Sequence, residues 1–177
     1  MNHLHLLRAP LLGLALLATC LPALPQQATR YTLEIIVFRV DGDASGEDPS
    51  AAPSLRSSSS TELATTPVSG RKLASAASRL RAGSGYRILA HTAWSQPAAG
   101  WNSRRGVSLS QLGVNVPGLS GNVVLERGQF LHLGFDLKLD EAGKVAQLAE
   151  IRRVKPDEAQ YYDNPQLGVI ALVTSGT

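Results

Sequence analysis

The chain has 177 residues, of which 44% are hydrophobic and 18% are charged, and its formal net charge at pH 7 is +3. This length predicts one domain with a core large enough to fold without metals. The apolar content and the low net charge exclude a wholly disordered chain. The single cysteine excludes a disulfide scaffold, and so small a basic excess does not indicate a nucleic-acid-binding face.

Residues 1–27 have the order of a secretory signal. Arg8 supplies a positive charge, a leucine-rich apolar run follows, and small and helix-breaking residues end the run at Pro22 and Pro25. These are the three regions of a signal peptide. The run is too short to cross a membrane, since a spanning helix needs about 20 residues. We therefore expect an N-terminal signal helix that is cleaved during export.

Cys20 leaves two interpretations of the signal open. Residues 17–20 resemble the box of a lipoprotein signal, in which the cysteine would carry a lipid, although Thr19 stands where that box prefers Gly, Ala or Ser. We prefer ordinary cleavage, which discards Cys20 and leaves His91 and His132 as the mature histidines. Lipid anchoring at Cys20 is the alternative.

Residues 28–177 are predicted to form a single α+β domain. Residues 31–40 are rich in β-branched and aromatic residues, which predicts a strand covered on both faces. Residues 41–70 are mostly Gly, Ser, Ala, Thr, Pro and acidic residues, which predicts a flexible insertion within that domain. Residues 71–81 carry apolar side chains at helical spacing, which predicts the main helix.

Strands are predicted for most of the remaining chain. Residues 98–117 are loop-like, whereas residues 129–140 alternate between apolar and polar, as in a strand with one buried face. The predicted core residues of this strand are Leu131, Leu133, Phe135, Leu137 and Leu139. Further strands are predicted over residues 86–96, 121–127, 145–154 and 167–174. The sum is a mostly antiparallel sheet of about five or six strands with one main helix.

Motifs for metals, cofactors or catalysis are weak. Residues 41–46 imitate the start of a calcium loop, but Ala52 stands where the loop needs a bidentate Glu. His91 and His132 belong to no local cluster of ligands, and a zinc site needs three or four. We expect no metal, no cofactor and no catalytic residue, and a hydrogen-bonded structural role for His91.

Aromatic, basic and turn residues are the candidates for ligand binding. An aromatic face can stack on a sugar ring, and a guanidinium group matches a carboxylate. For each residue the alternative is packing at the edge of the core or solvation in a loop. The candidates are Trp94, Trp101, Arg104, Arg105, Tyr162, Asp163 and Asn164.

Four segments of the sequence, taken together in their order and spacing, indicate a family more specifically than any one segment does. They are residues 31–38 (YTLEIIVF), 86–97 (YRILAHTAWSQP), 121–125 with 130–133 (GNVVL and FLHL), and 150–169. In these segments the chain resembles the CsiV family of bacterial periplasmic peptidoglycan-binding proteins. One departure is Asn164, where the turn of the family usually has His; as a turn residue Asn is a mild change.

The resemblance implies a function and a location. It implies a periplasmic protein of a Gram-negative cell that binds peptidoglycan and supports cell-wall assembly by wall synthases, without catalysis. The implied partners are peptidoglycan and a synthase or its activator, with no nucleic acid and no transmembrane anchor after cleavage. The alternative left open is a periplasmic hydrolase or transferase acting on cell-wall material through His91 or His132.

Overall fold

Strands make up most of the described part of the chain, which covers residues 29–41, 55–69 and 71–176 of a computed structural model. The strands are β1 (Arg30–Val40), β2 (Ser58–Ser59), β3 (Thr66–Pro67), β4 (Tyr86–Pro97), β5 (Ala99–Gly100), β6 (Arg105–Ser108), β7 (Leu119–Arg127), β8 (Leu131–Glu141), β9 (Lys144–Val154), β10 (Ala159–Asp163) and β11 (Leu167–Ser175), and the helix is α1 (Ala74–Ala82). The mostly antiparallel pairing and the single helix confirm the predicted fold class. No helix within these described ranges is long and apolar enough to cross a membrane.

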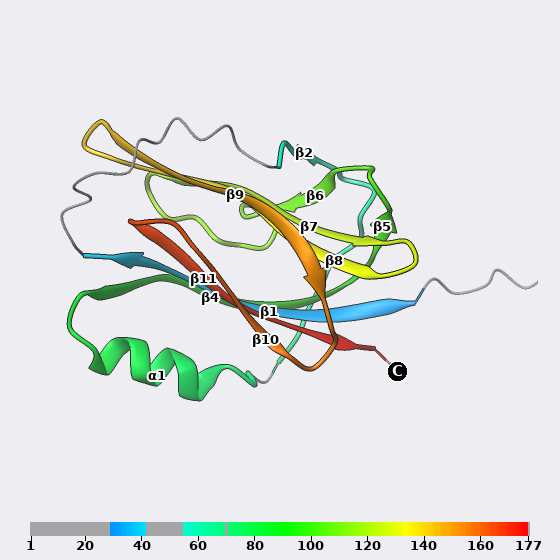
Figure 1. Ribbon diagram of the computed structural model, residues 1–177, viewed down its shortest axis with the longest axis horizontal. Helices are drawn as coiled ribbons and strands as arrows, with labels where there is room; N and C mark the ends of the chain where they lie inside the picture. The colour runs from blue at the N-terminus through cyan, green and yellow to red at the C-terminus, as the bar shows by residue number, and fades with distance from the viewer. Residues whose placement is uncertain (1–28, 42–54, 70, 177) are drawn as a thin grey trace, which may run out of the picture.

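The strands form two sheets that lie face to face, with α1 on the outside of the first (Figure 1). The first sheet has the order β10-β11-β1-β4-β3. The second has the order β2-β6-β7-β8-β9, with β5 beside β7. Each sheet therefore has an inner face toward the shared core and an outer face toward α1 or toward solvent.

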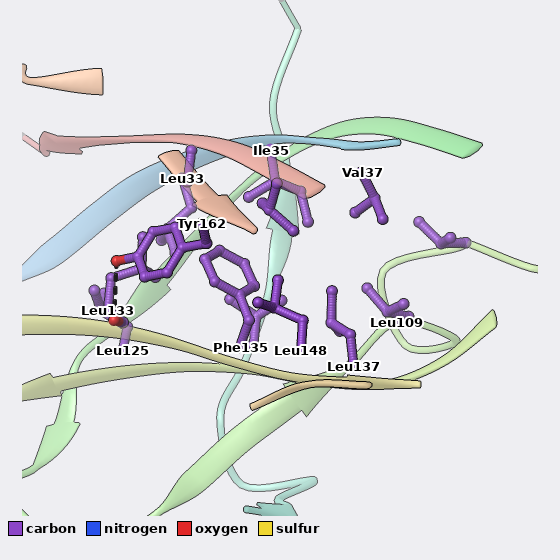
Figure 2. Packing of buried hydrophobic residues seen from close by; sticks show 14 of the residues in the cluster. Leu33, Ile35, Val37, Leu109, Leu125, Leu133, Phe135, Leu137, Leu148 and Tyr162 are labelled. Carbon is purple, nitrogen blue, oxygen red and sulfur yellow. Dashed lines mark hydrogen bonds between the residues drawn. The ribbon is translucent and has the colours of Figure 1, made fainter. Parts of the chain in front are cut away.

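The core between the sheets confirms the alternation predicted for β8. Its five predicted residues are all buried, and the strongly buried Leu33 and Ile35 of β1 face them from the first sheet. Tyr162 of β10 enters the same core, where its hydroxyl donates a hydrogen bond to the backbone oxygen of Leu133 at 3.0 Å (Figure 2). The odd-numbered residues of β8 therefore point inward, and the even-numbered ones lie on the outer face.

β1 is covered on both faces, as its sequence predicted. Leu33, Ile35 and Val37 belong to the core between the sheets, whereas Ile36 and Phe38 belong to a second cluster beneath α1. β1 also lies at the centre of its sheet, between β11 and β4. A strand in this position has no wet face, which explains its continuous apolar run.

α1 begins three residues later than the predicted range of 71–81. The backbone N–H groups of Lys72 and Leu73 donate to the carboxylate of Glu34 on β1, at 2.6 and 3.0 Å. These two N–H groups therefore bind a side chain of β1, and the helical hydrogen bonds begin only after them. A carboxylate at this end also suits the positive end of the helix dipole.

Residues 55–60, which we call the strap, cross the outer face of the second sheet. Leu55 is buried against Gly134 of β8, where a Cβ atom would lie 2.9 Å from the Leu55 Cδ2 atom. The backbone N–H and hydroxyl of Ser57 both donate to Asp136 Oδ2 at 3.0 Å. Within the range of 41–70 that was predicted as a flexible insertion, the strap is thus attached to the sheet by one leucine and several side-chain hydrogen bonds.

Other differences concern short strands. β5 and β6 lie within residues 98–117, which were predicted as loop, and β10 was not predicted. These strands are only two to five residues long, so they carry too few alternations for a periodic signal. The predicted signal helix at residues 1–27, with Cys20, lies outside the described residues, and so does the calcium-like segment beyond Asp41.

Candidate binding surface

The carboxylate of Glu126 organises the loop that carries Trp101. Glu126 lies near the end of β7 and is fully buried, with 0% of its surface exposed. It accepts hydrogen bonds from the backbone N–H groups of Asn102 and Arg104 at 3.1 and 2.5 Å, and from the Arg104 guanidinium at 3.0 Å. Asn102 and Arg104 both have positive φ angles, of 63° and 54°, so this carboxylate stabilises an otherwise unfavourable turn.

Trp101 is held on the outer face of the second sheet by this turn. Its ring centroid lies 4.0 Å from that of His132 on β8, and the Arg104 guanidinium carbon lies 5.5 Å from the Trp101 ring. A Cβ atom on Gly128 would come within 3.0 Å of the Trp101 Cβ atom, so a glycine there permits the close approach. Even so, 51% of Trp101 is exposed. A large aromatic side chain is therefore fixed in place and open to solvent.

Phe130 and Arg153 extend the surface around His132. Phe130 is 39% exposed, and the guanidinium carbon of Arg153 lies 3.5 Å from its ring centroid. Arg153 is directly opposite His132 in the pairing of β8 with β9. Among the described residues, Arg153 forms no ion pair with a carboxylate. We call the group formed by Trp101, Arg104, Phe130, His132 and Arg153 the aromatic surface.

The two arginines predicted as ligand-binding residues are both already paired. Arg104 is bound to the buried Glu126, as described above. Arg105 of β6 forms an ion pair with Glu62, whose side chain is 78% exposed. Arg104 contributes a cation to the aromatic surface, but much of its charge is balanced by Glu126. The arginine with the fewest competing partners there is Arg153, which the sequence did not single out.

Trp94 and Tyr162 are core residues. Trp94 is only 2% exposed, and its indole N–H donates to the Gln96 Oε1 atom at 2.7 Å. Tyr162 is 0% exposed and donates to a backbone oxygen of β8. Neither ring has an open face on which a ligand could stack, so both fit the packing alternative that was set beside the binding one.

Asn164 closes the turn between β10 and β11. Its Oδ1 atom accepts hydrogen bonds from the backbone N–H groups of Gln166 and Leu167, at 2.9 and 2.6 Å, and its Nδ2 donates to the backbone oxygen of Gln147. The two contacts of Oδ1 stabilise the turn itself, whereas the contact of Nδ2 joins the turn to β9. The neighbouring Asp163 is exposed at the end of β10 and lies apart from the aromatic surface in the fold.

The two histidines of the described residues, His91 and His132, have structural neighbours. His91 lies 2.7 Å from Glu34 through Nε2, and both side chains are nearly fully buried beneath the start of α1. This confirms the hydrogen-bonded role predicted for His91. His132 uses Nδ1 toward the Phe130 backbone oxygen at 3.2 Å. Within the described ranges, neither histidine is hydrogen-bonded to a serine or threonine hydroxyl, and three or more metal-ligating side chains nowhere cluster.

Perturbed pKa values lie between β9 and β10, away from the aromatic surface. A hydrogen bond from Arg152 to Glu150 raises the pKa of the Arg152 guanidinium. Burial raises the pKa of Tyr162 well above its ordinary value, although the nearby Arg152 opposes this. Burial, aided by the charge of Asp163, also raises the pKa of Tyr161. Both tyrosines therefore remain neutral hydrogen-bonding groups at physiological pH.

Sequence reasoning found Trp101 and Arg104 but missed Phe130, Arg153 and the role of Glu126. One signal that could have found Phe130 was the alternation along β8. It puts His132 on the outer face, and Phe130, two residues earlier, follows the same period. Arg153 could not be found from its own segment, because its position opposite His132 depends on the register between β8 and β9.

The fold and surface together define a two-sheet β protein with exposed aromatic and cationic side chains on the outer face of one sheet. A family model described as "Peptidoglycan-binding protein, CsiV" matches residues 11–175. The match covers nearly the whole chain, so this protein belongs to the CsiV family, as the resemblance indicated. Comparisons with curated proteins and with solved structures found no significant match.

Proposed function

We propose that this protein is exported to the periplasm, binds peptidoglycan there without catalysis, and supports the synthases that assemble the wall. Membership of a family described as peptidoglycan-binding supports the choice of ligand. The observation that carries the proposed site is the exposed pair Trp101 and Phe130, with Arg153 lying against the Phe130 ring.

The chemistry of the wall fits these side chains. Peptidoglycan combines sugar rings with short peptides that end in carboxylates. The open face of Trp101 can stack on a sugar ring, and the guanidinium of Arg153 can form paired hydrogen bonds with a carboxylate. Because Arg104 and Arg105 already bind Glu126 and Glu62, we assign the anion-binding role to Arg153 in place of that pair.

The aromatic part of the proposal is tested by co-sedimentation with purified sacculi. Trp101→Ala should weaken retention about fivefold, since one stacking contact contributes about 1 kcal/mol. The matched control is Tyr86→Ala, which removes an aromatic side chain of similar exposure, 44%, from the first sheet. Equal losses for both variants, or none for Trp101→Ala, would contradict the assignment of the site.

The anion-binding role of Arg153 is tested by measuring retention on sacculi at different salt concentrations. Exposed charge pairs are screened over about 10 Å at 0.1 M salt, so retention should fall as salt rises from low concentration. Arg153→Gln should weaken retention at low salt and flatten this dependence, whereas Arg79→Gln on α1 should leave both unchanged. A salt dependence that survives Arg153→Gln intact would place the anion contact elsewhere.

The non-catalytic and synthase parts need separate measurements. Sacculi incubated with the protein should release no soluble fragments; release that is lost in His91→Ala or His132→Ala would establish the enzymatic alternative. Proteins that co-purify from a periplasmic extract should include a wall synthase or its activator, identified by mass spectrometry. Their absence would leave peptidoglycan binding as the whole function.

A further inference from the structure

A concave feature lies at the other end of β7 from Trp101. It is a hollow of about 500 Å³ between the end of β6, the start of β7 and the loop that joins them. This volume lies within the range of about 300–1,000 Å³ that is usual for small-molecule sites. The polar residues that line it are Ser59, Ser108, Ser110, Asn115, Ser120 and Asn122. We call this feature the serine pocket.

The wall of the serine pocket is rigidly built. Gly118 and Gly121 have φ angles of +78° and +127°, which other residues rarely adopt. A Cβ atom on either glycine would lie 2.1 Å from a backbone oxygen of β8, so this part of β7 is pressed against its neighbour. The loop closes on itself through the hydrogen bond from the Val114 N–H to the Leu109 oxygen, at 2.9 Å. The pocket is therefore formed before any ligand arrives.

The lining combines neutral polar groups with small apolar side chains. None of its twelve lining residues is charged. Val116 is half-buried and Pro117 is exposed, so these two residues present aliphatic surface to the pocket, above the buried Leu109, Val114 and Leu119. The side chains of Asn115 and Ser120 are exposed and form no hydrogen bond with another described residue, so their amide and hydroxyl groups are available to a ligand.

This lining favours one component of the bacterial cell wall as the ligand. A peptide carboxylate or amine would meet no opposite charge here, and charged groups removed from water without a partner are strongly disfavoured. A sugar hydroxyl can exchange hydrogen bonds with Ser and Asn, and the methyl group of an acetamide can contact the aliphatic side chains. We propose that the serine pocket binds an N-acetylated amino sugar of the glycan, an inference that rests on the proposed function.

The position of the pocket complements the aromatic surface. Asn122 lines the pocket and Glu126 supports Trp101, and these residues are four apart on β7, which corresponds to about 13 Å along a strand. Glycan in the neutral pocket and peptide carboxylates at Arg153 would thus be bound at separate places on one face. The strap, which contributes Ser59 to the pocket, lies between them.

The test is a titration of the purified protein with a soluble probe, followed by NMR. The trimer of N-acetylglucosamine should shift the backbone amide signals of residues 108–122. Cellotriose, which has hydroxyl groups in place of the acetamides, should bind at least about tenfold more weakly. Shifts confined to Trp101, no shifts at all, or equal binding of both sugars would overturn the inference.

Variants link those shifts to the pocket. Ser110→Trp, which fills the exposed side of the pocket, should weaken binding of the trimer at least about tenfold, and Asn115→Ala about threefold. The matched control is Ser75→Trp, which places the same bulk on the exposed face of α1 and should bind as the wild type does. Unchanged binding in Ser110→Trp, with a folded spectrum, would overturn the inference.

The proposed function and the inference about the serine pocket can be contradicted independently of each other. If sacculi retain the protein in a manner that depends on Trp101 while the trimer does not bind the pocket, the pocket inference falls and the proposed function stands. If the trimer binds the pocket while sacculi do not retain the protein, the sugar specificity stands and the proposed function falls.

Discussion

Glu126 shows how one buried carboxylate can determine an exposed surface. It has 0% exposure, yet it balances Arg104 and two backbone N–H groups of a turn with positive φ angles. The sequence gives no sign of this, because Glu126 and Trp101 are 25 residues apart and meet through the pairing of β5 with β7. Trp101 could be proposed from its residue type, but its exposure depends on Glu126.

Removal of this carboxylate should destabilise the protein. Glu126→Ala leaves two N–H groups and a guanidinium without their acceptor, and hydrogen bonds to charged groups contribute about 1.5–3 kcal/mol each. We expect the free energy of unfolding in urea to fall by at least about 2 kcal/mol. Glu62→Ala is the control, since its exposed pair with Arg105 should contribute at most about 1 kcal/mol. Equal effects would show that the turn does not depend on Glu126.

Tyr162 should make the protein sensitive to alkaline pH. Burial raises the pKa of Tyr162 in the folded state, whereas in the unfolded chain it ionises near pH 10. Above about pH 10 the unfolded state binds fewer protons, so the free energy of unfolding falls as pH rises. Tyr162→Phe should lower stability at neutral pH by about 1 kcal/mol, through the lost hydrogen bond, and reduce the alkaline slope. An unchanged slope in urea unfolding at pH 9–11 would refute this.

At the scale of elements, the strap and β8 are fitted to each other. β8 was predicted with its correct faces, because five apolar residues alternate along it. The strap was not predicted, because its serines resemble those of a flexible linker. What fixes it is a glycine on the outer face of β8: at Gly134 a Cβ atom would lie 2.8 Å from the Ile151 Cβ and 2.9 Å from the Leu55 Cδ2. A leucine can be buried there only because the sheet leaves room for it.

A double-mutant cycle tests this fit. Leu55→Ala should cost about 2–4 kcal/mol of unfolding free energy, as for other buried leucines. Gly134→Ala should destabilise by steric conflict with both Leu55 and Ile151. Together the changes should cost less than their sum, by about 0.5–3 kcal/mol, because the shorter side chain at position 55 relieves part of the conflict. Strict additivity would mean that the strap does not rest on Gly134.

At the scale of the whole molecule, stability depends on the core between the two sheets. Leu133 is 0% exposed in that core, whereas the adjacent His132 lies on the outer face. Leu133→Asp places an unpaired charge between the sheets and should unfold the protein, as measured by circular dichroism. His132→Ala should cost about 1 kcal/mol or less, since it removes mainly the contact with Trp101. The opposite ranking would mean that the faces of β8 are assigned one residue out of register.

The sequence by itself determined the long strands, the helix, the coverage of β1 on both faces, the inward face of β8 and, through its resemblance, the family. These features are local: a period of two or of 3.6 residues is written in consecutive side chains. Only the tertiary structure decided that the strands form two sheets, that Trp94 and Tyr162 are buried while Trp101 is exposed, and that Arg153 lies beside Phe130. Those outcomes depend on register and on contacts between distant segments. A single aromatic or arginine residue has the same identity whether it is packed, paired or free, so its chemistry is settled only by its neighbours in space.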